Sequence, residues 1–177
     1  MKNLLSILRK EIFPISLILI LAFARLMPHP PNFTPIIAVA ILSGYFFKNI
    51  YLSFVALLIS LLLADFFIGF YNNMLFVYLS LFLIAFVFYK ISKQINFKNL
   101  FVYSFAGSLI FFVITNFGVW ALGNPGVYDV AYEKSLNGLT ECYILALPFF
   151  GNTFLSTLVF AYPVIFMYKS LVKGSTI

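Results

Sequence analysis

The chain has 177 residues, of which 63% are hydrophobic and only 9% are charged. Soluble domains carry roughly 25% charged residues, so this composition excludes an ordinary soluble domain and indicates an integral membrane protein. The formal net charge of +6 comes from lysines and arginines at the ends of apolar runs, not from a basic patch. We therefore expect no binding of nucleic acid.

Six apolar runs follow one another along the chain, and a membrane-spanning helix needs about 20 such residues. The sequence therefore predicts an all-α integral membrane protein, a six-transmembrane-helix bundle that forms a single membrane domain over residues 1–177. The predicted helices cover residues 12–27, 34–48, 50–70, 73–91, 99–122 and 142–168. The predicted outer lid loop covers residues 123–141. Ala40, Gly44 and Gly107 have small side chains at helix-packing spacing and predict close helix contacts.

Basic residues give the direction of the helices. Nine of the eleven lie on the side of the N-terminus: Lys2, Arg9, Lys10, Lys48, Lys90, Lys93, Lys98, Lys169 and Lys173. Arg25 and Lys134 lie on the other side. An excess of Lys and Arg marks cytoplasmic connections, so we predict cytoplasmic N and C termini and a multi-pass protein of the inner (cytoplasmic) membrane. In the alternative interpretation, residues 1–24 are a cleaved signal peptide, because they have a basic start, an apolar core and A-F-A at 22–24.

The segment 25–35, R-L-M-P-H-P-P-N-F-T-P, interrupts the apolar runs and holds the only histidine and four of the eight prolines. Proline lacks an amide proton and disfavours helix in the residue before it. Irregular backbone at membrane depth must be buried in protein or line a cavity, because lipid satisfies no hydrogen bonds. This segment is predicted to form the lip or lid of a binding site.

Other polar side chains fall on the same outer side. The predicted ligand-binding residues are His29, Asn32, Thr34, Asn116, Trp120, Tyr143 and Asn152. The indole face and the uncharged amides among them favour a neutral heterocycle over a phosphate. Each has a structural alternative: a solvated loop histidine, an asparagine that joins two helices, or a tryptophan of the aromatic belt.

Charged residues within the apolar runs need partners. Asp65 lies near the outer end of the third run, at the level of Arg25, and buried charges are usually paired. We therefore predict a structural ion pair between Arg25 and Asp65.

Catalytic motifs are not found: the sequence has no HExxH, no GxSxG and no P-loop. We expect no enzyme and assign no catalytic residues. With one histidine and a single cysteine, Cys142, we expect no metal and no cofactor.

Four stretches carry a resemblance to a known group of proteins. They are P-H-P-P-N-F-T-P at 28–35, L-L-A-D-F-F-I-G at 62–69, T-N-F-G-V-W at 115–120 and A-L-P-F-F-G-N-T at 146–153, and they resemble an uncharacterised family of small bacterial membrane proteins. More distantly, the layout is similar to the S components of energy-coupling factor (ECF) vitamin transporters. That resemblance implies an ECF S-component-like fold, an outward site under lid loops, and a transmembrane coupling subunit with ATPases as partner. The first helix departs from the docking face of many S components, since it carries only Ala22 and Ala24.

The sequence is compatible with two functions. The first is a substrate-capture subunit or small solitary transporter, with an outward-opening pocket for a vitamin-like or heterocyclic metabolite. The alternative is a structural or assembly membrane protein without a small-molecule ligand. The first has a small-molecule substrate as partner, and both have the lipid bilayer.

Overall fold

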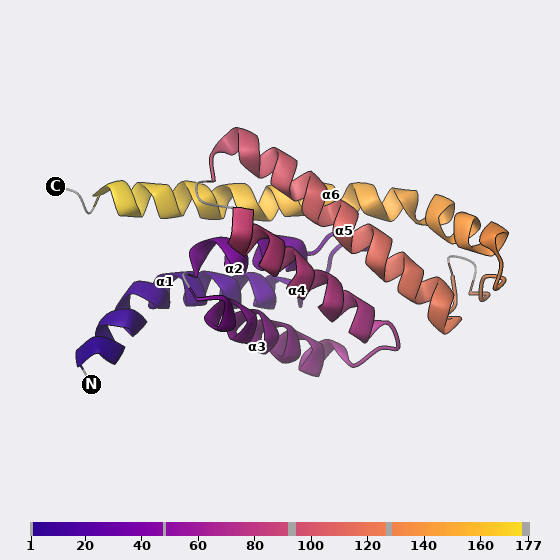
Figure 1. The fold of residues 1–177 in the computed structure, drawn as a ribbon, viewed down its shortest axis with the longest axis horizontal. Helices are drawn as coiled ribbons and strands as arrows, with labels where there is room; N and C mark the ends of the chain where they lie inside the picture. Colours follow the sequence, from indigo (N-terminus) through magenta and orange to yellow (C-terminus); the bar gives the residue numbers. More distant parts are fainter. Residues whose placement is uncertain (1, 48, 92–94, 127–128, 175–177) are drawn as a thin grey trace.

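The computed structural model describes residues 2–47, 49–91, 95–126 and 129–174, and this part of the chain contains six α-helices (Figure 1). They are α1 (Lys2–Ala24), α2 (Ile36–Phe46), α3 (Ile50–Ile68), α4 (Met74–Ile91), α5 (Phe97–Leu122) and α6 (Leu136–Gly174). Helix α1 begins and α6 ends at the same end of the bundle (Figure 1). The order and number of helices expected from the apolar runs are confirmed.

Several helix ends differ from those expected. Helix α1 begins at Lys2 rather than residue 12, and α6 covers 136–174 rather than 142–168. The connection between α5 and α6 is correspondingly shorter than the predicted lid loop 123–141. Apolar runs locate only the lipid-facing part of a helix, whereas backbone hydrogen bonding continues into polar sequence at its ends.

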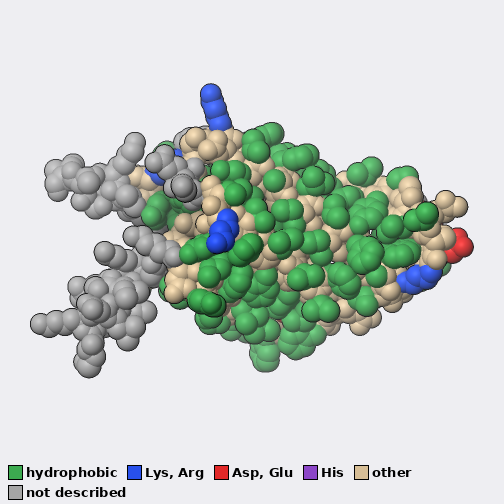
Figure 2. All heavy atoms as spheres, viewed as in Figure 1, with side chains coloured by type: hydrophobic (Ala, Val, Ile, Leu, Met, Phe, Trp, Pro, Cys, Tyr) green, Lys and Arg blue, Asp and Glu red, His purple; other side chains and the backbone are tan. Residues whose placement is uncertain are grey.

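In the part of the chain that the structure describes, four helices are long and apolar enough to cross a membrane: Ile50–Ile68, Met74–Ile91, Lys98–Leu122 and Leu136–Ser170. The apolar segments Pro14–Ala24 and Ile36–Phe46 are shorter. Figure 2 shows apolar side chains over most of the visible face, with the few charged side chains toward the two ends of its long axis. These features fit a multi-pass membrane protein.

The shortest helix, α2, lies in the middle of the bundle. Ten of its residues are buried, and it contacts each of the other five helices. A helix that is apolar on all sides is expected inside a protein or a membrane. With 11 residues it is only about 16 Å long, roughly half of a 30 Å hydrocarbon core. The irregular segment before it, residues 25–35, therefore lies where a longer helix would have continued.

Glycines allow α2 its close contacts. A Cβ atom on Gly44 would lie 2.3 Å from the Ala85 backbone oxygen of α4. A Cβ atom on Gly107 of α5 would lie 3.1 Å from side-chain atoms of Ile37 and Ile41. The predicted contacts at Gly44 and Gly107 are thus confirmed, because the missing side chains let the backbones approach.

Candidate functional site

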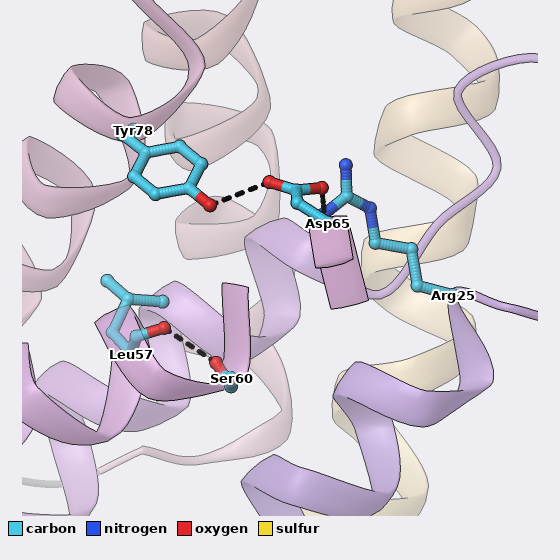
Figure 3. A network of polar contacts seen from close by, with 5 residues as sticks. All are labelled: Arg25, Leu57, Ser60, Asp65 and Tyr78. Atoms are coloured by element: carbon cyan, nitrogen blue, oxygen red, sulfur yellow. Dashed lines mark hydrogen bonds and ion pairs between the residues drawn. The ribbon is translucent and has the colours of Figure 1, made fainter. Parts of the chain in front are cut away.

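A buried charge cluster joins the ends of α1 and α3 to α4. The Arg25 Nη1 and Asp65 Oδ1 atoms are 2.6 Å apart, and the two side chains are 11% and 0% exposed. The Tyr78 hydroxyl donates to Asp65 Oδ2 at 2.7 Å (Figure 3). The ion pair that the sequence predicts is present. Tyr78 is the third residue of the cluster, and sequence reasoning missed it. The sequence does show a phenol within an apolar helix, and such a phenol needs a hydrogen-bond acceptor from the protein because lipid offers none.

Local backbone structure places the two charges at the same level. Arg25 follows the last turn of α1, and its amide donates to the Ala22 oxygen at 3.2 Å. Gly69 ends α3 with a φ of 100°, and its amide donates to the backbone oxygen of Asp65 at 2.8 Å. A positive φ is readily adopted only by glycine, so the helix stops one turn after Asp65. The pair therefore sits at the rim of the bundle.

Tyr71 adds a neutral hydroxyl near this cluster. Burial raises the pKa of the Tyr71 hydroxyl, the negative charge of Asp65 raises it further, and the positive charge of Arg25 opposes the rise. The hydroxyl oxygen is buried beside Arg25 and Asp65, and the raised pKa leaves the hydroxyl neutral.

An open hollow of about 550 Å³ lies beside the cluster. Its walls come from the residues that follow α1 and from the end of α3: Arg25, Leu26, Met27, Pro28, His29, Phe67 and Ile68. His29 is exposed, and its Nδ1 atom lies 2.9 Å from the Pro30 oxygen. The hollow thus combines apolar walls with a guanidinium and an imidazole. Small-molecule sites commonly occupy 300–1,000 Å³ and have this kind of lining.

The proline segment 25–35 is hydrogen-bonded to α6 through Asn152, and it carries two further predicted residues, Asn32 and Thr34. Asn152 of α6 donates from Nδ2 to the Pro31 oxygen at 3.0 Å. Asn32 is exposed with a left-handed φ of 59°, and Thr34 is half-buried before α2. The Asn152 amide therefore satisfies a backbone carbonyl of the irregular segment and fixes it to α6.

Asn116 and Tyr143 lie where α5 meets α6. Asn116 Nδ2 donates to the Phe112 oxygen of its own helix at 2.8 Å, and its backbone oxygen accepts from Cys142 Sγ at 3.4 Å. The Tyr143 hydroxyl donates to the Val113 oxygen at 2.7 Å. These groups hold the two helices together.

Trp120 anchors the connection between α5 and α6. Its indole Nε1 donates to the Glu133 oxygen at 2.9 Å. The Lys134 ammonium donates to the Trp120 oxygen and lies 5.3 Å from the indole centroid. Trp120 thus holds this connection to the end of α5.

The seven predicted ligand residues do not converge at one place in the fold. Trp120 is hydrogen-bonded to Glu133, just before α6 begins at Leu136. Asn152 lies about 24 Å along α6 from Leu136, at 1.5 Å per residue. Of the seven, only His29 lines the hollow beside Arg25. The physical reason is that most of the amide, indole and phenol donors take a nearby backbone carbonyl as acceptor.

Within the described residues, no three His, Cys, Asp or Glu side chains come together in a way that could hold a metal ion.

Comparison with known proteins gives a family but no function. A family model described as a family of unknown function (DUF6580) matches residues 6–176. No curated protein matches, and no solved structure matches.

Proposed function

The chain belongs to DUF6580, a family of unknown function, and we propose that it is a membrane protein that captures a small molecule at the outer ends of α1 and α3. The carrying observation is the hollow of about 550 Å³ beside the Arg25–Asp65 pair. Ionisable side chains within a membrane are rare and usually mark a pathway or a binding site. A capture role needs only such a site and access to it.

The hollow opens to the outside in the topology that the basic residues favour. Nine of the eleven lysines and arginines fall on the opposite side, which is then cytoplasmic. The protein would act as a small solitary transporter, or as the capture subunit of a larger one in the inner membrane. Active uptake would then need a transmembrane coupling subunit with ATPases.

The ligand class follows from the residues that line the hollow. A vitamin-like heterocycle was expected because Trp120 and Asn116 would stack on it and bond to it, but both bond elsewhere. The side chains that line the hollow are aliphatic and aromatic, with one guanidinium and one imidazole. This lining favours a ligand with an apolar part and a polar end.

The test is mass spectrometry of small molecules that co-purify with the protein. Ile68→Trp fills the hollow at a side chain that is 48% exposed, and Leu147→Trp, at a residue that is 56% exposed on α6, is the matched control. We expect one compound at near-stoichiometric amount in the wild type and the control, and at least a tenfold loss in Ile68→Trp. If the wild type retains no such compound, or all three proteins retain it equally, the proposal is wrong.

One observation favours the alternative of a structural or assembly protein. Phenylalanine rings form a ladder along α5 and α6: Phe101 lies 5.3 Å from Phe154, Phe105 lies 5.7 Å from Phe154 and from Phe150, and Phe112 lies 5.5 Å from Phe150. Phe101 and Phe105 are 51% and 45% exposed. Such a face suits a transmembrane helix of a partner. A photo-crosslinking residue at Phe101 that captures one protein in stoichiometric yield would support this function, and labelling of lipid alone would contradict it.

A further inference from the structure

The hollow beside Arg25 is closed towards the middle of the bilayer. The depression between α1 and α3 that shares Arg25 with it has a volume of only about 10 Å³. The next one, which shares Ala22 and Ala64 with that depression, has a volume of about 0 Å³. A long hydrocarbon chain therefore cannot continue from the hollow between the two helices, and the apolar part of a ligand must be compact.

The charged groups of the cluster present a positive charge to the hollow. The Arg25 guanidinium lines the hollow, whereas the Asp65 carboxylate that pairs with it is wholly buried and is not part of the lining. Tyr71, near the pair, is neutral. Among the described residues that line the hollow there is no Asp or Glu. A ligand therefore meets a cation whose counter-charge lies behind it, which favours an anionic group over an ammonium group.

The Arg25 guanidinium has donors left for such an anion. A guanidinium carries five N–H donors in a planar fork, and Asp65 pairs with Nη1 at 2.6 Å. Nε and Nη2 carry the other donors, and a planar fork matches the two oxygens of a carboxylate. A phosphate dianion needs more positive charge, and within the described residues no lysine and no second arginine lines the hollow. The guanidinium thus favours a monocarboxylate.

His29 supplies a second polar contact. Its Nδ1 atom lies 2.9 Å from the Pro30 oxygen, and a carbonyl oxygen only accepts. Nδ1 therefore holds a hydrogen, and Nε2 is the nitrogen left for a ligand. An imidazole nitrogen and a carboxyl group share one proton in a hydrogen bond, whichever of the two holds it. His29 is thus also suited to a carboxylic acid.

We propose that the hollow binds a compact monocarboxylic acid, with its carboxyl group at Arg25 and His29 and its apolar body against Met27, Phe67 and Ile68. The proposal rests on the proposed capture function and names its ligand class. The side chains of Met27 and Phe67 are 66% and 65% exposed. A bound apolar body would cover part of this surface, and burial of apolar surface favours binding.

The experiment is isothermal titration calorimetry on the full-length protein in nanodiscs, with empty nanodiscs as the blank. Phenylpropanoate is the acid probe. Phenylpropanol and phenylpropylamine carry the same body with a neutral and a cationic end, and acetate tests the carboxylate alone. We expect one copy of the acid per protein, bound at least tenfold more tightly than the alcohol or the amine, and no detectable binding of acetate. Palmitate in the nanodisc membrane should not displace the acid, because the hollow does not continue inwards.

Charge changes at Met27, which lines the hollow, test the sign of the ligand. Met27→Lys should tighten binding of the acid at least threefold, and Met27→Glu should weaken it at least threefold, with the opposite effects on the amine. Leu136→Lys, at an exposed side chain where α6 begins, is the matched control and should change neither probe. A misfolded variant would not gain affinity, so the gain in Met27→Lys is informative even if the other variants fold poorly.

Arg25→Lys tests the planar fork separately from the charge. Lysine keeps the positive charge that pairs with Asp65 but has no fork. The acid should bind at least fivefold more weakly, whereas binding of the alcohol should not change and would show that the hollow is intact. An unchanged affinity for the acid would remove the role of the Arg25 fork.

Other outcomes would overturn the ligand class. Equal binding of the acid, alcohol and amine would contradict the anionic end, and displacement of the acid by palmitate would contradict the compact body. If the compound that co-purifies is lost in Ile68→Trp, has no acidic group and is not displaced by phenylpropanoate, the ligand class is wrong and the capture function stands. If the wild type retains no compound and binds none of the probes, both are wrong.

Discussion

Replacing Asp65 by asparagine should lower the free energy of unfolding by about 3–5 kcal/mol, because removal of one partner leaves a buried charge uncompensated. The Arg25 side chain is 11% exposed and the Asp65 side chain is 0% exposed, so solvent screens the pair little. Asparagine still accepts one hydrogen bond, which favours the lower end of that range. Tyr78→Phe removes only the 2.7 Å bond to the carboxylate, and should lower it by about 1.5–3 kcal/mol.

The decisive measurement is a double-mutant cycle of Arg25→Met, Asp65→Asn and the two combined. Reversible unfolding in mixed micelles gives the free energy of each variant, and Glu141→Gln, an exposed acid-to-amide change on α6, is the control that should stay within about 0.5 kcal/mol of wild type. The double variant should lose at least about 1.5 kcal/mol less than the sum of the two single losses. Additivity within about 0.5 kcal/mol would show that the pair does not hold α1 to α3.

Three further predictions concern packing, the irregular segment and topology. Gly44→Ala should destabilise the protein by about 1–3 kcal/mol in the same unfolding measurement, since its Cβ atom would lie 2.3 Å from the Ala85 oxygen. Gly151→Ala, where a Cβ atom meets nothing within 4 Å, should be neutral or stabilising by up to about 1 kcal/mol; equal losses would contradict the close α2–α4 contact. Asn152→Ala removes the 3.0 Å bond to the Pro31 oxygen and should speed amide exchange in the segment before α2 without changing α4, and an unchanged exchange rate would show that this bond does not fix the segment. Reporter fusions should place the α4–α5 connection inside and the α5–α6 connection outside; the reverse result would overturn the topology.

Composition and charge pairing are the features that the sequence specified best. Long apolar runs with few charges favour helices in a membrane, because a helix satisfies its backbone hydrogen bonds within one segment. The number and order of the six helices followed from the apolar runs. The Arg25–Asp65 pair was also foreseeable, since two charges at one level of an apolar bundle have few other partners.

Helix ends and polar contacts were less predictable. Lys2 lies within α1 and Leu136 begins α6, although neither belongs to an apolar run. Trp120, Tyr143 and Asn152 were expected to face one pocket, yet each donates to a backbone carbonyl of another segment. Which carbonyl lies nearest depends on how each helix is rotated and displaced relative to its neighbours, and residue spacing does not contain that information.

The sequence by itself predicted the composition of a multi-pass membrane protein, six helices, and the pairing of Arg25 with Asp65. Only the tertiary structure decided that the short α2 is central, that Tyr78 completes the charge cluster, and that an open hollow lies beside Arg25 at His29. The physical reason is the lack of polar contrast around the helices. In a soluble protein the polar face of a helix shows which side turns outward, whereas α2 is apolar on every side. Its orientation is set by close packing at small residues such as Gly44, and packing of this kind appears only in three dimensions.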